Sequence, residues 1–270
     1  MRLLKDNLIT MGQGTPVVLL HSSMSSKLQW YQLMRSLSQD HLAIALDFYG
    51  CGASPLPGHL ETFSLSDEII LVESLLEGVI PRDEPFHIVG HSYGGAVGLR
   101  LSYKAQEKIR SLTLFEPVAF HLLRGIDEDV LDNVLKIQDT VNNYIKQDNY
   151  SAAAGYFIDY YNEPGTFSGF PKEMQDILCQ GAKKLPLGFQ ALVNEPLSLE
   201  DYRNINIPVC VILGRQSPIS SRRAAELLPG YLPNCRFHSV DGGHMVPLTL
   251  PGLVNPIIES FIRRTERGAN

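Results

Sequence analysis

The sequence predicts an α/β protein with a doubly wound, mostly parallel sheet, and two observations support this. Short runs rich in Val, Ile and Leu recur along the 270-residue chain, and amphipathic helical patterns separate them. Because several of the runs are almost continuously apolar, they suit strands that are buried on both faces of a parallel sheet. Strands that alternate with helices form such a sheet through right-handed crossovers.

Six apolar runs predict the main strands, and a shorter strand is expected near residues 7–11. The six runs are Pro16–Leu20, Leu42–Leu46, Phe86–Val89, Leu112–Phe115, Val209–Leu213 and Arg236–Val240. Helices are predicted between and after them over Leu28–Leu37, Ser66–Leu76, Gly94–Ala105 and Leu253–Arg263. The first of these should bury Tyr31, Met34 and Leu37 on one stripe, and Ser66 should cap the second.

One stretch breaks the alternation, because helical patterns follow one another there without a strand between them. The clearest is Glu128–Lys146, with apolar residues at helical spacing. Pro171 is expected to begin a further helix, and Pro186-Leu187-Gly188 is interpreted as a break. We therefore expect residues 1–120 and 204–270 to form the α/β core and residues 121–203 to form an inserted helical cap.

Composition and charge narrow the classes of partner. The hydrophobic fraction is 44%, and the net charge of −6 gives no reason to expect binding to nucleic acid or to an anionic membrane. No apolar run is long enough for a membrane span, and the first residues do not resemble a secretory leader. The four cysteines form no CxxC pair, so no metal site is indicated, and nothing signals an organic cofactor. We expect a cytoplasmic protein, for which a homodimer is an open alternative to a monomer.

The strongest motif is a G-x-S-x-G sequence, Gly90-His91-Ser92-Tyr93-Gly94. The apolar run Phe86–Val89 precedes it and a helix with small residues follows it, which is the strand–turn–helix context that this motif requires. A β-carbon at either glycine would collide with the neighbouring strand or helix. The motif predicts Ser92 as a nucleophile, and the alternative is a glycine-rich turn with an incidental serine.

Three further segments carry a family resemblance. They are Val17-Val18-Leu19-Leu20-His21-Ser22-Ser23, Asp47-Phe48-Tyr49-Gly50-Cys51-Gly52-Ala53-Ser54 and Val240-Asp241-Gly242-Gly243-His244-Met245. With them the chain resembles the α/β-hydrolase superfamily over nearly its whole length.

The resemblance implies roles for four residues. It implies that His244 takes the proton of Ser92, and that the backbone N–H groups of Ser23 and Tyr93 hold the developing oxyanion. The family's usual glycine before the oxyanion residue is Ser22 here, which makes the conformation of that loop an open point. His21 and Asp47 are interpreted as structural hydrogen-bonding residues.

The acid of the expected Ser–His–acid triad is missing from its usual place. Most of the superfamily has G-x-x-D after the strand at Val209–Leu213, and this chain has Gly214-Arg215-Gln216-Ser217 there. Glu116 follows the neighbouring strand and keeps the order nucleophile, acid, base. We predict Glu116 as the acid, with a structural ion pair between Glu116 and Arg215 as the alternative.

These residues predict acyl transfer. A serine nucleophile disfavours the dehalogenase and epoxide hydrolase reactions of the superfamily, which use an aspartate. The expected cap is rich in Phe and Tyr and has no Lys/Arg cluster, so a small to medium, neutral, partly apolar carboxylic ester is the predicted substrate. Two alternatives stay open: other serine-dependent chemistry, such as C–C bond hydrolysis, lactone opening or cofactor-free peroxidation, and a ligand-binding sensor with weak residual hydrolysis.

Overall fold

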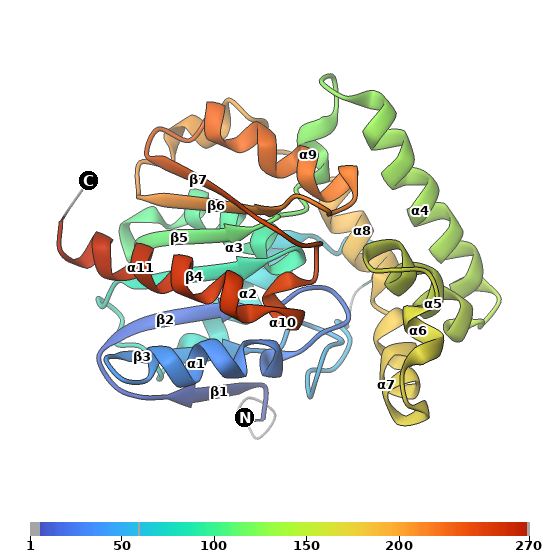
Figure 1. Cartoon of the computed structure of the whole chain (residues 1–270), viewed down its shortest axis with the longest axis horizontal. Coiled ribbons are helices and arrows are strands. Elements are labelled where there is room, and N and C mark those ends of the chain that lie inside the picture. Colours follow the sequence, from blue (N-terminus) through green and yellow to red (C-terminus); the bar gives the residue numbers. More distant parts are fainter. Residues whose placement is uncertain (1–5, 59, 269–270) are drawn as a thin grey trace.

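The computed structural model describes residues 6–58 and 60–268, and a seven-stranded sheet forms its centre (Figure 1). The strand order is β1-β3-β2-β4-β5-β6-β7, and only the β1–β3 pair is antiparallel. The strands are β1 (Leu8–Met11), β2 (Thr15–Leu20), β3 (His41–Leu46), β4 (Phe86–His91), β5 (Ile109–Phe115), β6 (Val209–Gly214) and β7 (Cys235–Val240). This confirms the predicted fold class, and every predicted run lies within a strand.

Helices cover both faces of the sheet. One face is packed by α1 (Tyr31–Leu37) and α11 (Asn255–Glu266), which lie in front of the sheet in Figure 1. The other face is packed by α2 (Leu65–Leu76), α3 (Tyr93–Lys104) and α9 (Ile219–Leu227), and α10 (Val246–Thr249) is a short turn near α11. Within the described residues, no helix is long and apolar enough to cross a membrane.

Two predictions about the first two helices were wrong. A 3₁₀ turn over Lys27–Trp30 precedes α1, so the buried stripe shifts to Trp30, Leu33, Met34 and Leu37, and Tyr31 is 48% exposed. The tighter winding of the 3₁₀ turn changes which side chains face the sheet. The N-cap of α2 is Ser64, and its backbone N–H donates to Asp67 Oδ2 at 2.8 Å in a capping box.

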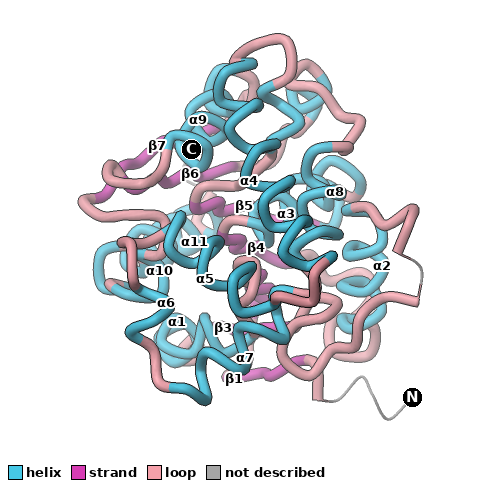
Figure 2. The backbone as a smooth tube through the Cα atoms, turned by 90° about the vertical axis from the view of Figure 1, so that its right-hand side faces the viewer, coloured by secondary structure: helices cyan, strands magenta, loops and turns pink. Residues whose placement is uncertain are grey.

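Between β5 and β6 the chain forms helices and connecting segments, without a strand. The helices are α4 (Glu128–Lys146), α5 (Tyr150–Tyr161), α6 (Thr166–Gly169), α7 (Lys172–Ala182) and α8 (Leu185–Val193). They gather at the carboxyl ends of the parallel strands (Figures 1 and 2). The predicted break at Pro186 was wrong, because a proline in the first turn of α8 removes no intrahelical hydrogen bond. The domain boundaries at 121 and 203 stay a prediction.

Candidate functional site

Ser92 lies on a sharp turn between β4 and α3. Its backbone has φ 55° and ψ −117°, a conformation that few residues other than glycine adopt. A β-carbon on Gly90 would lie 2.5 Å from the carbonyl oxygen of Gly94, and one on Gly94 would lie 2.4 Å from that of Leu20. The predicted reason for both glycines is confirmed. Sheet and helix approach so closely that the turn holds Ser92 in one strained conformation.

Ser92, His244 and Glu116 form a continuous series of hydrogen bonds. His244 Nε2 lies 2.9 Å from Ser92 Oγ, and His244 Nδ1 lies 2.6 Å from Glu116 Oε2. All three side chains are buried, although they come from three different segments of the chain. A carboxylate that accepts from Nδ1–H leaves Nε2 free to accept a hydroxyl proton, so this arrangement can activate a serine.

Glu116 is held by two backbone groups of the neighbouring strand β6. It follows β5 directly, with φ 43°, and its N–H donates to the carbonyl oxygen of Ile212 in β6 at 2.9 Å. Its Oε1 accepts from the N–H of Gly214 at 2.6 Å, which leaves Oε2 for His244. The left-handed turn and the two backbone contacts together aim the carboxylate at the imidazole.

The end of β6 supplies no acid to His244. Ser217 is buried, and its Oγ has no hydrogen-bond partner within the part of the chain that the structure describes. The ion pair between Glu116 and Arg215 is not formed, because Arg215 Nη1 instead contacts Asp241 Oδ1 at 2.5 Å on an exposed surface.

Ser23 and Tyr93 both lie beside Ser92. Tyr93 is the first residue of α3, so its N–H has no acceptor within the helix. Ser23 and Ser92 line the same small cavity, and the N–H of Gly94 donates to the carbonyl oxygen of His21 at 3.1 Å. This last contact ties the loop after β2 to the turn at Ser92, so the backbone of Ser23 is held close to the hydroxyl.

The Tyr93 side chain points away from Ser92 to a buried ion pair. Its hydroxyl donates to Glu68 Oε1 at 3.0 Å, and Lys184 Nζ donates to the same oxygen. The Lys184 ammonium also lies 4.7 Å from the centroid of the Tyr93 ring. Burial, together with the charge of Glu68, raises the pKa of Tyr93 well above its usual value. Because its side chain is held there, only the backbone N–H of Tyr93 is available beside Ser92.

His21 and Asp47 make structural hydrogen bonds, in line with their interpretation from the sequence. His21 Nδ1 lies 2.7 Å from the carbonyl oxygen of Ser22, and its Nε2 accepts from the N–H of Phe48 at 3.2 Å. Asp47 accepts from the backbone N–H groups of Lys27 and Ala53 and from the Lys27 ammonium. Both side chains therefore fix loops around the site.

The cavity beside Ser92 is small and apolar. Its volume is about 20 Å³, near the minimum that holds one water molecule. Most of its walls are apolar side chains from the segment after β5 and from α5 and α8, namely Val118, Phe120, Phe157, Leu185, Phe189 and Leu192. Tyr161 closes it on one side, with its ring centroid 4.8 Å from that of His244.

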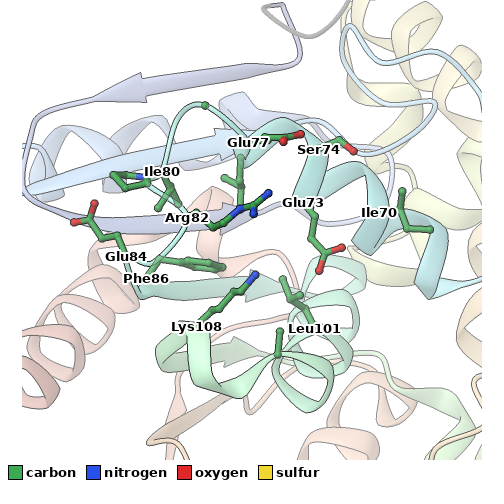
Figure 3. Close-up of a pocket in the computed structure, with 14 residues that line it drawn as sticks. Ile70, Glu73, Ser74, Glu77, Ile80, Arg82, Glu84, Phe86, Leu101 and Lys108 are labelled. Carbon is green, nitrogen blue, oxygen red and sulfur yellow. The ribbon is translucent and has the colours of Figure 1, made fainter.

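A larger groove of about 590 Å³ lies elsewhere, between α2, α3 and the start of β4 (Figure 3). Phe86 lines it at the amino end of β4, whereas Ser92 follows the carboxyl end of that strand. Its rim mixes the charges of Glu73, Glu77, Arg82 and Lys108, and it contains none of the predicted site residues. Across residues 6–58 and 60–268, no group of three or more His, Cys, Asp or Glu is placed to hold a metal ion.

Sequence reasoning did not single out two buried polar residues at the site. His91 occupies a variable position of the G-x-S-x-G motif, and Gln29 lies in a segment whose pattern predicted only a helix. Both are buried and hydrogen-bonded to each other. No local pattern marks such a pair, because their contact joins residues 62 positions apart.

The family follows from the match of residues 17–256 to the model of the alpha/beta hydrolase family. The chain belongs to the alpha/beta hydrolase family. Among solved structures, a hydrolase from Pseudomonas aeruginosa PA01 is similar with a TM-score of 0.79 at 19% identity, over 94% of this chain and 93% of that one. This likeness shows the shared hydrolase fold.

Curated relatives of this hydrolase-family chain differ in their reactions. The chain is 24% identical to monoacylglycerol lipase abhd6-B of Xenopus laevis, over 93% of this chain and 76% of that protein. It is 32% identical to cis-3-alkyl-4-alkyloxetan-2-one decarboxylase of Shewanella oneidensis, over 44% of this chain and 37% of that protein. The matches cover less than two thirds of the length of several relatives, and the family alone therefore leaves the reaction open.

Proposed function

We propose that this chain is a serine hydrolase that cleaves small to medium, neutral, partly apolar carboxylic esters through an acyl-enzyme on Ser92. The observation that carries the proposal is the unbroken series from Ser92 Oγ through the His244 ring to Glu116, with contacts of 2.9 and 2.6 Å. Three buried groups from distant segments meet there in the order that nucleophilic catalysis needs.

In the proposed mechanism, Ser92 Oγ attacks the ester carbonyl carbon while His244 Nε2 takes the hydroxyl proton. Glu116 orients the imidazole and stabilises its positive charge, and the N–H groups of Ser23 and Tyr93 donate to the oxyanion of the tetrahedral intermediate. Collapse breaks the bond to the alkoxy group, which leaves as an alcohol with the proton from His244. Water, activated by the same imidazole, then hydrolyses the acyl-enzyme and releases the acid.

The cavity supports a neutral, apolar substrate. Its walls are mainly aliphatic and aromatic, and none of its lining residues is charged. At about 20 Å³ it is too small for an ester, so the side chains of α5 and α8 must move apart when substrate binds. Phe157, Tyr161 and Phe189 are the side chains expected to move.

Two alternatives compete with this proposal. The sensor alternative depended on a missing acid, and the 2.6 Å contact between Glu116 and His244 counts against it. Other serine-dependent reactions, including C–C bond hydrolysis and lactone opening, would use the same three residues on a different substrate, and C–C bond hydrolysis would break a different bond. A panel of different substrates distinguishes them from ester hydrolysis.

The test is a chain-length panel of nitrophenyl esters, together with a lactone and a vinylogous diketone, assayed with the wild type and with Ser92→Ala. We expect ester turnover to be fastest in the panel and to fall at least 10³-fold in Ser92→Ala. Mass spectrometry of a quenched reaction should show the acyl mass on the peptide that contains Ser92. Turnover that survives in Ser92→Ala would refute the mechanism. If the lactone or the diketone is turned over faster than every ester, that compound and not an ester represents the substrate class.

A further inference from the structure

A chain of buried hydrogen bonds runs behind the proposed catalytic residues and joins the loop after β2 to the loop after β7. The Ser22 N–H and Oγ both contact Gln29 Oε1, at 3.0 and 2.9 Å. Gln29 Nε2 lies 3.1 Å from His91 Nδ1, and His91 Nε2 lies 2.9 Å from the carbonyl oxygen of His244. We call these groups the amide–imidazole chain.

The two ends of the amide–imidazole chain, the Ser22 N–H and the His244 carbonyl oxygen, determine the direction of the hydrogen bonds between them. The backbone N–H of Ser22 can only donate, so the group of Gln29 that faces it must be the carbonyl oxygen. The Gln29 NH₂ group then faces His91 Nδ1, which must accept. The proton of the imidazole is left on Nε2, where it meets a carbonyl oxygen that can only accept. Both ends thus require the same neutral tautomer of His91.

A protonated His91 does not fit this chain, because its Nδ1–H would face the NH₂ group of Gln29. Burial keeps the imidazole neutral, since desolvation lowers the pKa of His91 well below 6.5 and the neighbouring His244 lowers it further. Ser22, Gln29 and His91 are all buried, so water cannot replace a lost partner without rearrangement. Every donor and acceptor in the chain therefore depends on its neighbour.

The residues at the two ends belong to the proposed machinery. Ser22 directly precedes Ser23, whose N–H is a proposed oxyanion donor, and the carbonyl at the other end belongs to His244 itself. In the middle, His91 directly precedes Ser92, and its ring centroid lies 5.0 Å from that of His244. The amide–imidazole chain therefore connects the segments that carry Ser23, Ser92 and His244, whose relative positions must be kept during the reaction.

We propose that Gln29 and His91 are positioning residues that hold the Ser23 N–H and the His244 ring in their places relative to Ser92. The proposal rests on the serine hydrolase function and deepens it. A displacement of about 1 Å at a reacting group can cost roughly 100-fold in rate. A break in the chain should therefore slow the chemistry of Ser92 more than it weakens substrate binding.

Three variants interrupt the chain in different ways. Gln29→Met keeps the side-chain length and removes the three hydrogen bonds of the Gln29 amide, and His91→Leu removes both hydrogen bonds of the imidazole. His91→Gln keeps a donor where Nε2–H was and so preserves the link to the His244 carbonyl. The matched control is His87→Leu, because His87 is a buried histidine on the same strand whose Nδ1 lies 2.7 Å from Ser111 Oγ, near the amino end of β4.

The rate of Ser92 modification by a fluorophosphonate is measured for each folded variant, with kcat and KM on the best ester. We expect Gln29→Met and His91→Leu to lose roughly 10- to 100-fold in modification rate and in kcat, with KM within about threefold. His91→Gln should recover most of the loss. If the two disruptive variants react as fast as His87→Leu at equal folded fraction, the positioning role is wrong.

A second measurement does not depend on activity. In ¹⁵N-histidine spectra at pH 7, His91 should carry its proton on Nε2, and Gln29→Met should relax that preference. A proton on Nδ1, or a charged imidazole, would overturn the proposed direction of the chain. The spectra show which nitrogen of His91 carries the proton even when no ester is turned over. A failure of the proposed function can therefore be distinguished from a failure of this inference.

Discussion

The ends of β5 and β6 lie side by side and contribute different groups to the proposed catalytic site. β5 ends in Glu116, whose φ of 43° and 2.6 Å contact bring a carboxylate to His244 Nδ1. β6 ends in Gly214, which contributes only a backbone N–H to the other oxygen of that carboxylate. The residue three positions later, Ser217, has a buried hydroxyl with no hydrogen-bond partner in the described structure.

This difference shows that the position of an acid in space matters more than its position in the sequence. Phe115 and Ile212 are paired in the parallel register, so a side chain after either strand starts from nearly the same place. In this chain one strand end supplies the charge and the other supplies the donor that orients it. The proposed triad is therefore completed across two strands.

The largest effect is expected from removal of the charge at the end of β5. Glu116→Gln keeps the shape of the side chain, but its neutral amide no longer stabilises the imidazolium. In well-studied serine proteases the loss of the acid costs about 10⁴-fold in turnover, and we expect kcat on the best ester to fall at least 100-fold here. A loss below tenfold would assign Glu116 a structural role.

A smaller and opposite effect is expected when the charge is moved to the end of β6. A β-carbon placed on Gly214 would lie 2.8 Å from Ser217 Oγ and 2.9 Å from the carbonyl oxygen of Gly243, so Ser217 and the loop that carries His244 both lie close to Gly214. Glu116→Gln/Ser217→Asp should therefore recover about tenfold in kcat over Glu116→Gln. Glu116→Gln/Ser217→Asn, which lacks the charge, is the control and should recover nothing.

The pH of these assays matters, because other buried histidines destabilise the fold in acid. Burial lowers the pKa of His21, His87 and His121 to about 4. In the unfolded chain the same histidines bind protons below about pH 6.5, whereas in the folded protein they stay neutral down to about pH 4. The free energy of unfolding is therefore highest above pH 6.5 and decreases as the pH falls towards 4. We expect Tm to fall steadily from pH 7 to pH 5.

The control for this prediction is His87→Gln, which removes one buried titrating group. Its Tm should change less between pH 7 and pH 5 than that of the wild type. An unchanged slope would show that the acid sensitivity comes from other groups. The Glu116 and Ser217 variants are best compared above pH 6.5, where these histidines do not lower the stability of the fold and a change in kcat reports on catalysis.

The smallest effect is expected at Ser217 alone. Its hydroxyl has no partner in the described structure, so Ser217→Ala removes no hydrogen bond and leaves only a minor change in packing. We expect kcat within about twofold of the wild type and an unchanged or slightly higher Tm. A loss comparable to that of Glu116→Gln would make the end of β6, not that of β5, the partner of His244.

Local patterns predicted most elements of the fold but not all of their boundaries. Apolar runs identify buried strands because both faces of a parallel strand must be apolar, which Val17–Leu20 and Val209–Leu213 satisfy. The end and cap of a helix depend on weaker local contacts, so Ser66 was chosen in place of Ser64, and Pro186 was interpreted as a break where α8 begins. A single proline or serine is compatible with several of these positions.

What the sequence alone determined is the sheet, the turn at Ser92 and the candidates Glu116 and His244. Hydrophobic periodicity and the collision of a β-carbon at Gly90 with Gly94 are local constraints, and local constraints are visible in a sequence. The collision at Gly94 involves Leu20 of β2, so the sequence indicates it only through the G-x-S-x-G motif. Only the tertiary structure decided which acid faces the imidazole, that Arg215 turns to Asp241, and that Gln29 meets His91. Those contacts join residues that are not neighbours in the sequence. The contact between Glu116 and His244 depends in addition on the register of β5 and β6 and on the left-handed backbone of Glu116.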